Sequence, residues 1–415
     1  MKELSRRTFF KGAAAAGAVA AGAGLAACGS NAASSAASSA AASEAAASSA
    51  AASEAASTAA ASEDAIPMTI GYWGGNCCEL GVYVAIENHT FEANGIEPNV
   101  VTITADTSEL LANDEIDFFL WTPGFFLSWL QGANAKLLDT MHMGCWSGIT
   151  LEGNGIESAA DLKGKKVGCT GMSGPSYVES NALYSRATGG THDDINWVVY
   201  DGTLLLQALK DGEVDAIIGI DSTLYPQVKE TEGAKFFFIS AQELSDYFCC
   251  FVCCNTHTLD KHPEAGDRLV KAFADAVDIL RDDVDAAVEM AIEKGYTVGK
   301  YPAIEKGLAN NYLYSHGNEQ DFWDSIYERW DELRIAGFLP DCPEDETEAK
   351  AYLEELTHGI GEWHGGVGAA TAFKPLAEQA KERGDAFGVN AEDIRNAEAD
   401  AESEAKGAAA NTGNI

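Results

Sequence analysis

The sequence predicts an α/β fold in which parallel strands alternate with helices. Short apolar runs alternate with segments of helical spacing from Ile66 to Ile220. Two strand-to-helix junctions, Trp73–Asn76 and Thr170–Tyr177, are rich in glycine or small residues. About 350 residues follow Ala65, enough for two domains of ordinary size. We therefore expect two α/β units with a glycine-rich loop in each.

The first junction is the clearest candidate site. A strand expected at Met68–Tyr72 stops at Gly74 and Gly75, and helical spacing begins by Leu80. The first amides of a helix lack partners within it, and glycines let a ligand approach the backbone. Trp73, Gly74, Gly75 and Asn76 are therefore predicted to contact a ligand. The alternative is an ordinary strand-to-helix turn.

Further elements follow in order up to Met143. Strands are expected at Asn99–Thr104, Ile116–Leu120 and Lys136–Met141, and helices at Glu79–Ala93, Thr107–Leu111 and Gly124–Leu130. Ligands collect at the carboxyl ends of strands in such sheets, so the loop Trp121, Thr122 and Pro123 should lie beside the first junction.

A second series of strands and helices begins near Lys166. Strands are expected at Lys166–Cys169, Ile195–Val199 and Val214–Ile220, with helices at Ser176–Arg186 and Thr203–Lys210. The loop after the first strand carries Met172, Ser173, Gly174, Ser176 and Tyr177, which we predict to contact a ligand. Capping of the helix by Ser173 or Ser176 is the alternative, and both roles can hold at once.

Two long amphipathic helices are expected later, at Pro263–Lys294 and Gln320–Ala336. Their aromatic residues are assigned to core packing. Two extended runs, Cys145–Leu151 and Tyr247–Asn255, flank the second series.

The N-terminus has the pattern of an export signal. Arg6 and Arg7 precede a mildly apolar segment, the layout of a twin-arginine signal, and Leu25–Gly29 resembles a bacterial lipobox. We expect residues 1–27 to be removed, Cys28 to be lipidated, and the protein to be anchored on the extracytoplasmic face of the membrane. Residues 28–65, rich in Ala and Ser, are expected to form a disordered tether. Residues 364–415 are an acidic, Ala-rich extension of unknown role.

The chain is strongly acidic, with 64 Asp and Glu residues against 27 Lys and Arg, for a net charge of −37. This charge argues against binding to nucleic acid or electrostatic adhesion to anionic lipid. It does not exclude an anionic ligand held by local dipoles.

Three segments carry a family resemblance: Ile70–Trp73, Asp161–Gly168 and Leu209–Ala216. Together they resemble the solute-binding proteins of nitrate, sulfonate, taurine and thiamine-precursor ABC importers, over roughly Ile66–Gly337. The resemblance implies a two-lobed type II periplasmic-binding-protein fold. Its first lobe would be discontinuous (66–147 and 251–363) and its second would span 148–250. The two extended runs named above would be the crossover strands.

The resemblance also implies a function. Ligand would bridge the lobes and stabilise a closed form that a permease and its ATPase recognise, with no enzymatic chemistry, cofactor or metal. The protein is expected to act as a monomer. Beyond the residues already named, the family's cleft-lining loops map onto Gly148 and Asp221.

The expected loops contain no Lys or Arg, so an anionic group would rest on amides and hydroxyls. Asp221 suits a cationic or amino group. Together they suit a small zwitterion such as an aminosulfonate, or else an aminopyrimidine. If Asp221 points outward or caps the next helix, this argument does not apply.

Nine cysteines remain besides Cys28. Side chains alternate along a strand, so Cys249 and Cys253 should face away from Cys250 and Cys254, and these four cannot converge on one metal. The cysteines are interpreted as small buried residues, with a disulfide from Cys77 or Cys78, or a metal or cluster site, as alternatives. An exported redox or metal protein therefore remains a rival hypothesis. The histidines show no metal-ligand spacing. A ligand-modifying enzyme is a further alternative, although no histidine falls in the expected loops.

Overall fold

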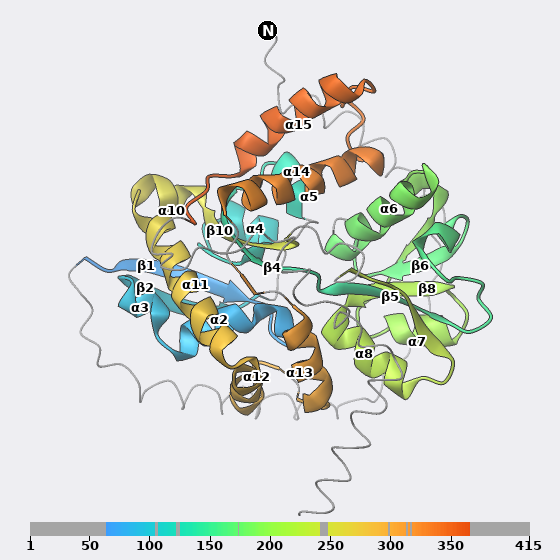
Figure 1. Ribbon diagram of the computed structural model, residues 1–415, viewed down its shortest axis with the longest axis horizontal. Helices are drawn as coiled ribbons and strands as arrows, with labels where there is room; N and C mark the ends of the chain where they lie inside the picture. The colour runs from blue at the N-terminus through green and yellow to red at the C-terminus, as the bar shows by residue number, and fades with distance from the viewer. Residues whose placement is uncertain are drawn as a thin grey trace, which may run out of the picture. The chain divides into compact units, whose positions relative to one another are not determined.

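The first lobe contains two small sheets (Figure 1). In one, β1 (Ile66–Tyr72) pairs in parallel with β2 (Ile96–Thr102). In the other, β10 (Cys250–Asn255) lies antiparallel between β3 (Leu120–Trp121) and β4 (Ala135–His142). A parallel bridge between Ile70 and Phe118 joins β1 to the segment just before β3. The computed structural model describes residues 64–103, 107–121, 125–172, 174–240, 248–297, 299–312, 314–315 and 318–365.

The second lobe has one five-stranded sheet in the order β7-β6-β8-β5-β9. Its strands are β5 (Trp146–Leu151), β6 (Lys166–Cys169), β7 (Asn196–Val199), β8 (Ala216–Ile220) and β9 (Ala234–Ile239). β6 runs parallel to β7 and β8, whereas β5 runs antiparallel to β8 and β9.

The chain crosses between the lobes twice. It leaves the first lobe after β4, enters the second with β5, and returns to the first with β10. β5 and β10 each enter from the other lobe, and each lies antiparallel to both of its neighbours. This topology confirms the expected type II fold, with a discontinuous first lobe and two crossovers.

Helices cover both lobes (Figure 1). Those between β1 and β5 are η1 (Cys77–Glu79), α2 (Leu80–Glu87), α3 (Thr90–Ala93), α4 (Thr107–Ala112) and α5 (Phe125–Leu130). Those between β5 and β10 are η2 (Ala159–Leu162), α6 (Pro175–Thr188), η3 (His192–Asp194), α7 (Leu205–Lys210) and α8 (Asp221–Glu230). After β10 come α10 (Thr256–Lys261), α11 (Ala265–Asp282), α12 (Val284–Glu293), α13 (Pro302–Asn311), α14 (Glu319–Ile335) and α15 (Glu346–Ile360).

Two of the expected long helices are broken. The segment Pro263–Lys294 divides at Asp283, whose backbone is extended and whose carboxylate accepts from the Ala286 amide, so that it caps α12. The segment Glu79–Ala93 divides at His89, which has a φ of 57°. In both places apolar periodicity continues across the break, which is why it predicted one helix. The bounds of β6 were predicted correctly.

Several predictions lie outside the described residues. These are the signal with Arg6 and Arg7, the lipidated Cys28, and the tether up to residue 63. The C-terminal extension from residue 366 and the loop residues Thr122, Pro123 and Ser173 also lie outside. Among the residues that are described, no helix has the length and apolar character that a membrane span requires.

The core of the first lobe is organised around α11. Phe273 is fully buried, with its ring centroid 5.5 Å from that of Phe91 and 4.7 Å from that of Phe118. These contacts join α11 to α3 and to the segment before β3. They hold the end of β1, and with it the first glycine loop, in place.

We predict that Phe273→Ala lowers the free energy of unfolding by about 3–5 kcal/mol, because it leaves a cavity where three rings meet. Urea unfolding followed by circular dichroism measures this. Ile279→Ala, on the same helix but 43% exposed, should change the same quantity by about 0.5 kcal/mol or less. Equal losses in the two variants would contradict this role of α11.

Candidate functional site

The first glycine loop satisfies its own amides. Gly74 and Gly75 have φ values of 76° and 79°, in the left-handed region that favours glycine. The amides of Trp73 and Gly74 donate to the Glu79 carboxylate at 2.9 and 2.8 Å, and the Gly75 amide donates to the Tyr296 carbonyl at 2.7 Å. The expectation of unpaired amides is therefore wrong for these three positions.

The reason lies in Glu79, which is fully buried one turn after the loop. Besides the two amides it accepts from the Tyr83 hydroxyl at 2.9 Å and the Asn76 side-chain amide at 3.1 Å. Burial raises the pKa of Glu79, against the lowering effect of these donors. The spacing of Asn76 and Glu79 is that of a helix-capping pair, a signal in the sequence that points to this arrangement.

Asn76 and Trp73 have different surroundings. Asn76 is buried and caps η1, accepting from the Glu79 amide at 3.3 Å and from the Cys78 thiol at 2.7 Å. Trp73 is 37% exposed and packs edge to face on Phe119, with ring centroids 5.6 Å apart. Of this loop, Trp73 is thus the side chain most open to a solute.

The second loop is also largely buried. Gly174 is the N-cap of α6, and Ser176 is buried in its first turn. Tyr177 packs against Trp197 and Phe338, with ring centroids 4.8 and 5.3 Å away, and burial raises its pKa to about 12. Met172 is 49% exposed.

Two other predicted residues are placed for packing. A Cβ at Gly148 would lie 2.4 Å from the Phe237 ring and 2.6 Å from the Phe238 ring, so the aromatic side chains require a glycine there. Trp121 pairs through its backbone with Phe251 in β10.

Asp221 lies inside the protein, at the first position of α8. It is 1% exposed, its amide donates to the Cys145 carbonyl at 2.9 Å, and the Tyr312 hydroxyl lies 3.4 Å from its carboxylate. Its Oδ1 has no hydrogen-bond partner among the described residues, and its Oδ2 is the oxygen nearest the Tyr312 hydroxyl, so the carboxylate does not cap α8. Burial chiefly raises the pKa of Asp221 to about 7, while Ser147 and Tyr312 hold it lower than burial alone would. Both alternatives for this residue, an outward-pointing or a capping carboxylate, are excluded.

A histidine and three cysteines converge beside Asp221. His142, Cys145, Cys249 and Cys250 are all buried, and their ligand atoms lie within 4.8 Å of one another. The sequence left a metal or cluster site as an alternative, and the four residues that the structure brings together are not the four cysteines Cys249, Cys250, Cys253 and Cys254 considered there. Strand alternation does separate Cys253, whose thiol donates to the Phe119 carbonyl at 2.9 Å. It does not separate Cys249 from Cys250, because Cys249 lies before β10 begins and the pairing with β4 shifts after Cys250.

The nine described cysteines are free thiols, and all but Cys342 are buried. The Cys77 sulfur lies 3.6 Å from the Glu305 carbonyl, and Cys78 bonds to Asn76. The disulfide alternative for Cys77 or Cys78 is not formed in this structure. Hydrogen bonds from Cys145 and Cys250 and the nearby His142 lower the pKa of Cys249 well below its ordinary value, although burial opposes this shift.

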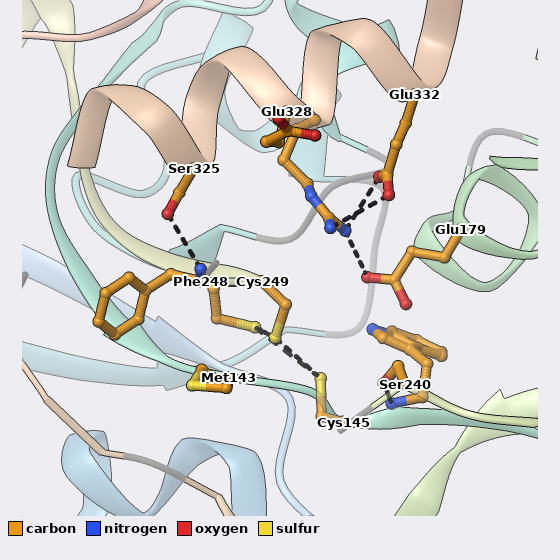
Figure 2. A network of polar contacts seen from close by, with 12 residues as sticks. Met143, Cys145, Glu179, Ser240, Phe248, Cys249, Ser325, Glu328 and Glu332 are labelled. Carbon is orange, nitrogen blue, oxygen red and sulfur yellow. Dashed lines mark hydrogen bonds and ion pairs between the residues drawn. The ribbon is translucent and has the colours of Figure 1, made fainter. Parts of the chain in front are cut away.

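An ion network joins the lobes next to this cluster (Figure 2). Arg329 of α14 lies 3.1 Å from Glu179 of α6 and 3.1 Å from Glu332, and all three side chains are fully buried. Arg186 bridges Glu328 and Glu332 at 3.0 and 3.4 Å. Three carboxyl groups thus share two guanidinium groups. The sequence did not predict this network. Its members come from α6 and α14, and the periodicity of each helix does not reveal that the two helices pack against each other.

The predicted site residues are only partly brought together. Asn76 accepts from the thiol of Cys78, which neighbours Cys145 and His142. The Asp221 amide donates to the Cys145 carbonyl. Both residues therefore lie beside the group of His142, Cys145, Cys249 and Cys250. Tyr177 faces Trp197 and Phe338 instead. A wide groove of about 1250 Å³ between α6, α14 and α15 is lined by none of the predicted residues.

These features define a class of protein, the two-lobed periplasmic binding proteins. The structure superposes on the alkanesulfonate-binding protein SsuA from Xanthomonas axonopodis bound to MOPS (TM-score 0.58, 13% identity, 73% of this chain and 100% of the other). It also superposes on the nitrate-binding protein NrtA from Synechocystis (TM-score 0.56, 11% identity, 79% and 92%). At these identities the likeness shows the fold alone.

The NMT1/THI5-like family model matches residues 76–287, just over half of the chain, and the chain belongs to this family. It is 24% identical to the fission yeast 4-amino-5-hydroxymethyl-2-methylpyrimidine phosphate synthase over 236 residues, covering 52% of this chain and 66% of that enzyme. It is 25% identical to a protein of Brucella abortus named as a binding protein, covering 55% of this chain and 71% of the relative.

We predict that Glu179→Gln makes stability less dependent on pH. Burial raises the pKa of Glu179 well above its ordinary value, and nearby Cys249 and Glu332 add to the rise against the opposing charge of Arg329. The folded protein therefore keeps a proton that the unfolded chain releases above about pH 4.3. The stability from this group is complete below that pH and is lost as the pH rises through the folded pKa, by up to about 1.4 kcal/mol per pH unit.

Urea unfolding between about pH 5 and about pH 8 should then show a larger loss in the wild type than in Glu179→Gln. The exposed Glu354→Gln on α15 is the control and should follow the wild type. Parallel losses in all three proteins would show that Glu179 does not hold the extra proton.

Proposed function

We propose that the protein is the extracytoplasmic solute-binding component of an ABC importer. The observation that carries this proposal is the topology, two lobes joined by two crossovers that meet at one place. Such a hinge lets a ligand between the lobes favour a closed form, which a permease and its ATPase then recognise. The binding proteins among the relatives and structural neighbours support this proposal. Capture needs no enzymatic chemistry.

The N-terminal pattern supplies the anchor in this proposal. Residues 1–27 would direct export, Cys28 would carry the lipid, and residues 28–65 would hold the folded body away from the membrane. Residues 66–147 and 251–363 would form one lobe and residues 148–250 the other, with 364–415 as an extension. Such a protein would act as a monomer until it meets the permease.

The charges around the lobe junction bear on the solute. Glu79 occupies the loop amides that would hold an anion, and Asp221 is a buried acid between the lobes. A solute with a cationic or hydrogen-bond-donating nitrogen offsets these carboxylates, whereas nitrate or a simple alkanesulfonate does not. We therefore propose a small zwitterion such as taurine as the first candidate, with Asp221 facing its amino group and Trp73 its hydrocarbon part.

An aminopyrimidine of the thiamine-precursor kind is the second candidate. The family itself and the fission yeast relative, whose name contains an aminopyrimidine phosphate, favour it. Its ring would stack on an aromatic side chain and its amino group would donate to Asp221.

A thermal-shift screen of the full chain tests both candidates. Taurine, alkanesulfonates, nitrate, aminopyrimidines and amino acids would each be added in excess. A true ligand at a hundred times its Kd stabilises the fold by about 2.7 kcal/mol and raises Tm by several degrees. We expect the shift from a nitrogen-bearing solute and none from nitrate.

Titration calorimetry on Asp221→Asn then tests the assigned contact. The variant should bind the nitrogen-bearing solute at least about tenfold more weakly, since a charged partner is lost. Asp193→Asn, with its side chain 87% exposed, should bind as the wild type does. A tight ligand without nitrogen, or unchanged binding by Asp221→Asn, would overturn the assignment of the solute.

A further inference from the structure

The histidine and cysteine cluster has the dimensions of a metal site. The Cys145 sulfur lies 3.8 Å from the Cys249 sulfur and 3.9 Å from the Cys250 sulfur, and the last two sulfurs are 3.5 Å apart. His142 places a ring nitrogen within 4.8 Å of the three sulfurs. In a tetrahedral zinc site with Zn–S bonds of about 2.3 Å, neighbouring sulfurs are about 3.8 Å apart, so the three thiols already stand near the required spacing.

The donor types agree with that geometry. Three cysteines and one histidine form one of the common ligand sets of structural zinc, and thiolates select zinc over the harder divalent cations. Burying thiolates without a cation is strongly unfavourable, and all four side chains are buried. A divalent cation would balance most of the charge that their ionisation creates.

The surroundings of His142 independently indicate that it can bind a metal. Its Nδ1 lies 3.0 Å from the Met143 carbonyl, the backbone contact that commonly orients a metal-binding histidine. Its Nε2 is buried and has no hydrogen-bond partner among the described residues. Such an orphaned nitrogen is costly unless something else occupies it.

The four residues also stand where the lobes are joined. His142 ends β4 and Cys145 directly precedes β5, so both belong to the outward crossover. Cys249 and Cys250 belong to the return crossover, and Figure 2 shows the Cys145 side chain pointing toward Cys249. A bond from one ion to all four would link the two crossovers.

We propose that His142, Cys145, Cys249 and Cys250 bind one thiophilic cation of the Zn²⁺ type, which clips the two crossovers together at the hinge. This site replaces the expectation from sequence that the chain holds no metal. It goes beyond solute capture and does not depend on it. As zinc binds, each thiol releases its proton to solvent and its sulfur donates a lone pair to the ion, with no change in oxidation state.

The first experiment uses Co²⁺ as a visible probe of the full chain, kept reduced by a non-thiol reductant and stripped of metal by a chelator. One equivalent of Co²⁺ should produce a thiolate-to-cobalt charge-transfer band and the d–d bands of a tetrahedral site. Zn²⁺ should abolish both bands by displacement and raise Tm. A spectrum without charge transfer, or one that never saturates near one equivalent, would overturn the proposal.

Matched variants assign the ligands. Cys145→Ser should weaken Zn²⁺ binding at least about a hundredfold, because one strong ligand is lost. Cys253→Ser is the control, since Cys253 is as fully buried as Cys145 and lies in β10 with Cys250, but bonds to the Phe119 carbonyl outside the cluster. Equal weakening in both variants would contradict the assignment.

X-ray absorption on the zinc-loaded wild type decides the matter should Cys145→Ser fail to fold. The expected shell is three sulfurs at about 2.3 Å and one nitrogen at about 2.0 Å. A shell of oxygen and nitrogen alone, or mass analysis showing Cys145 oxidised to a disulfide with Cys249 in the native protein, would exclude the site. The solute screen has a separate readout, so failure of one proposal is distinguishable from failure of the other.

Discussion

The chain passes between its two lobes at one place, and the two crossings are bonded to each other there. The Cys249 amide donates to the His142 carbonyl at 3.1 Å, and the Trp146 amide donates to the Ser240 hydroxyl at 2.9 Å. Backbone groups buried at such a junction need partners within the protein, since water does not reach them. This requirement brings the ends of β4 and β9 and the starts of β5 and β10 side by side. The same packing brings His142, Cys145, Cys249 and Cys250 together and buries Asp221.

Acidic groups in the interior of the protein have specific hydrogen-bond or ion-pair partners. The chain carries a net charge of −37, yet the acids buried near the lobe junction have specific partners. Glu79 accepts from two loop amides, a hydroxyl and a side-chain amide, and Glu179 meets Arg329 across the lobes. Removing Arg329 would leave buried carboxyl groups without their cationic partner, which is strongly destabilising in protein interiors.

Local features of the fold could be predicted from the sequence because they depend on neighbours a few residues away. Alternating apolar runs indicated β1, β4, β6 and β8, and the bounds of β6 were correct. Periodicity could not indicate where Asp283 interrupts a helix, because the apolar pattern runs on through the break. The buried position of Asp221 and the packing of Tyr177 on Phe338 also escaped prediction, since each depends on a residue more than 80 positions away in the chain.

The sequence by itself determined the α/β class, the alternation of strands and helices, the glycines of the first loop and the pattern of the export signal. Only the tertiary structure decided that Glu79 occupies the loop amides, that Arg329 joins the lobes, and that His142 and Cys145 meet Cys249 and Cys250. The physical reason is the separation along the chain between the residues that interact. Strand and helix preferences follow from backbone geometry and adjacent side chains, whereas the cysteine cluster joins residues over 100 positions apart, and only the return of the chain through the hinge brings them into contact.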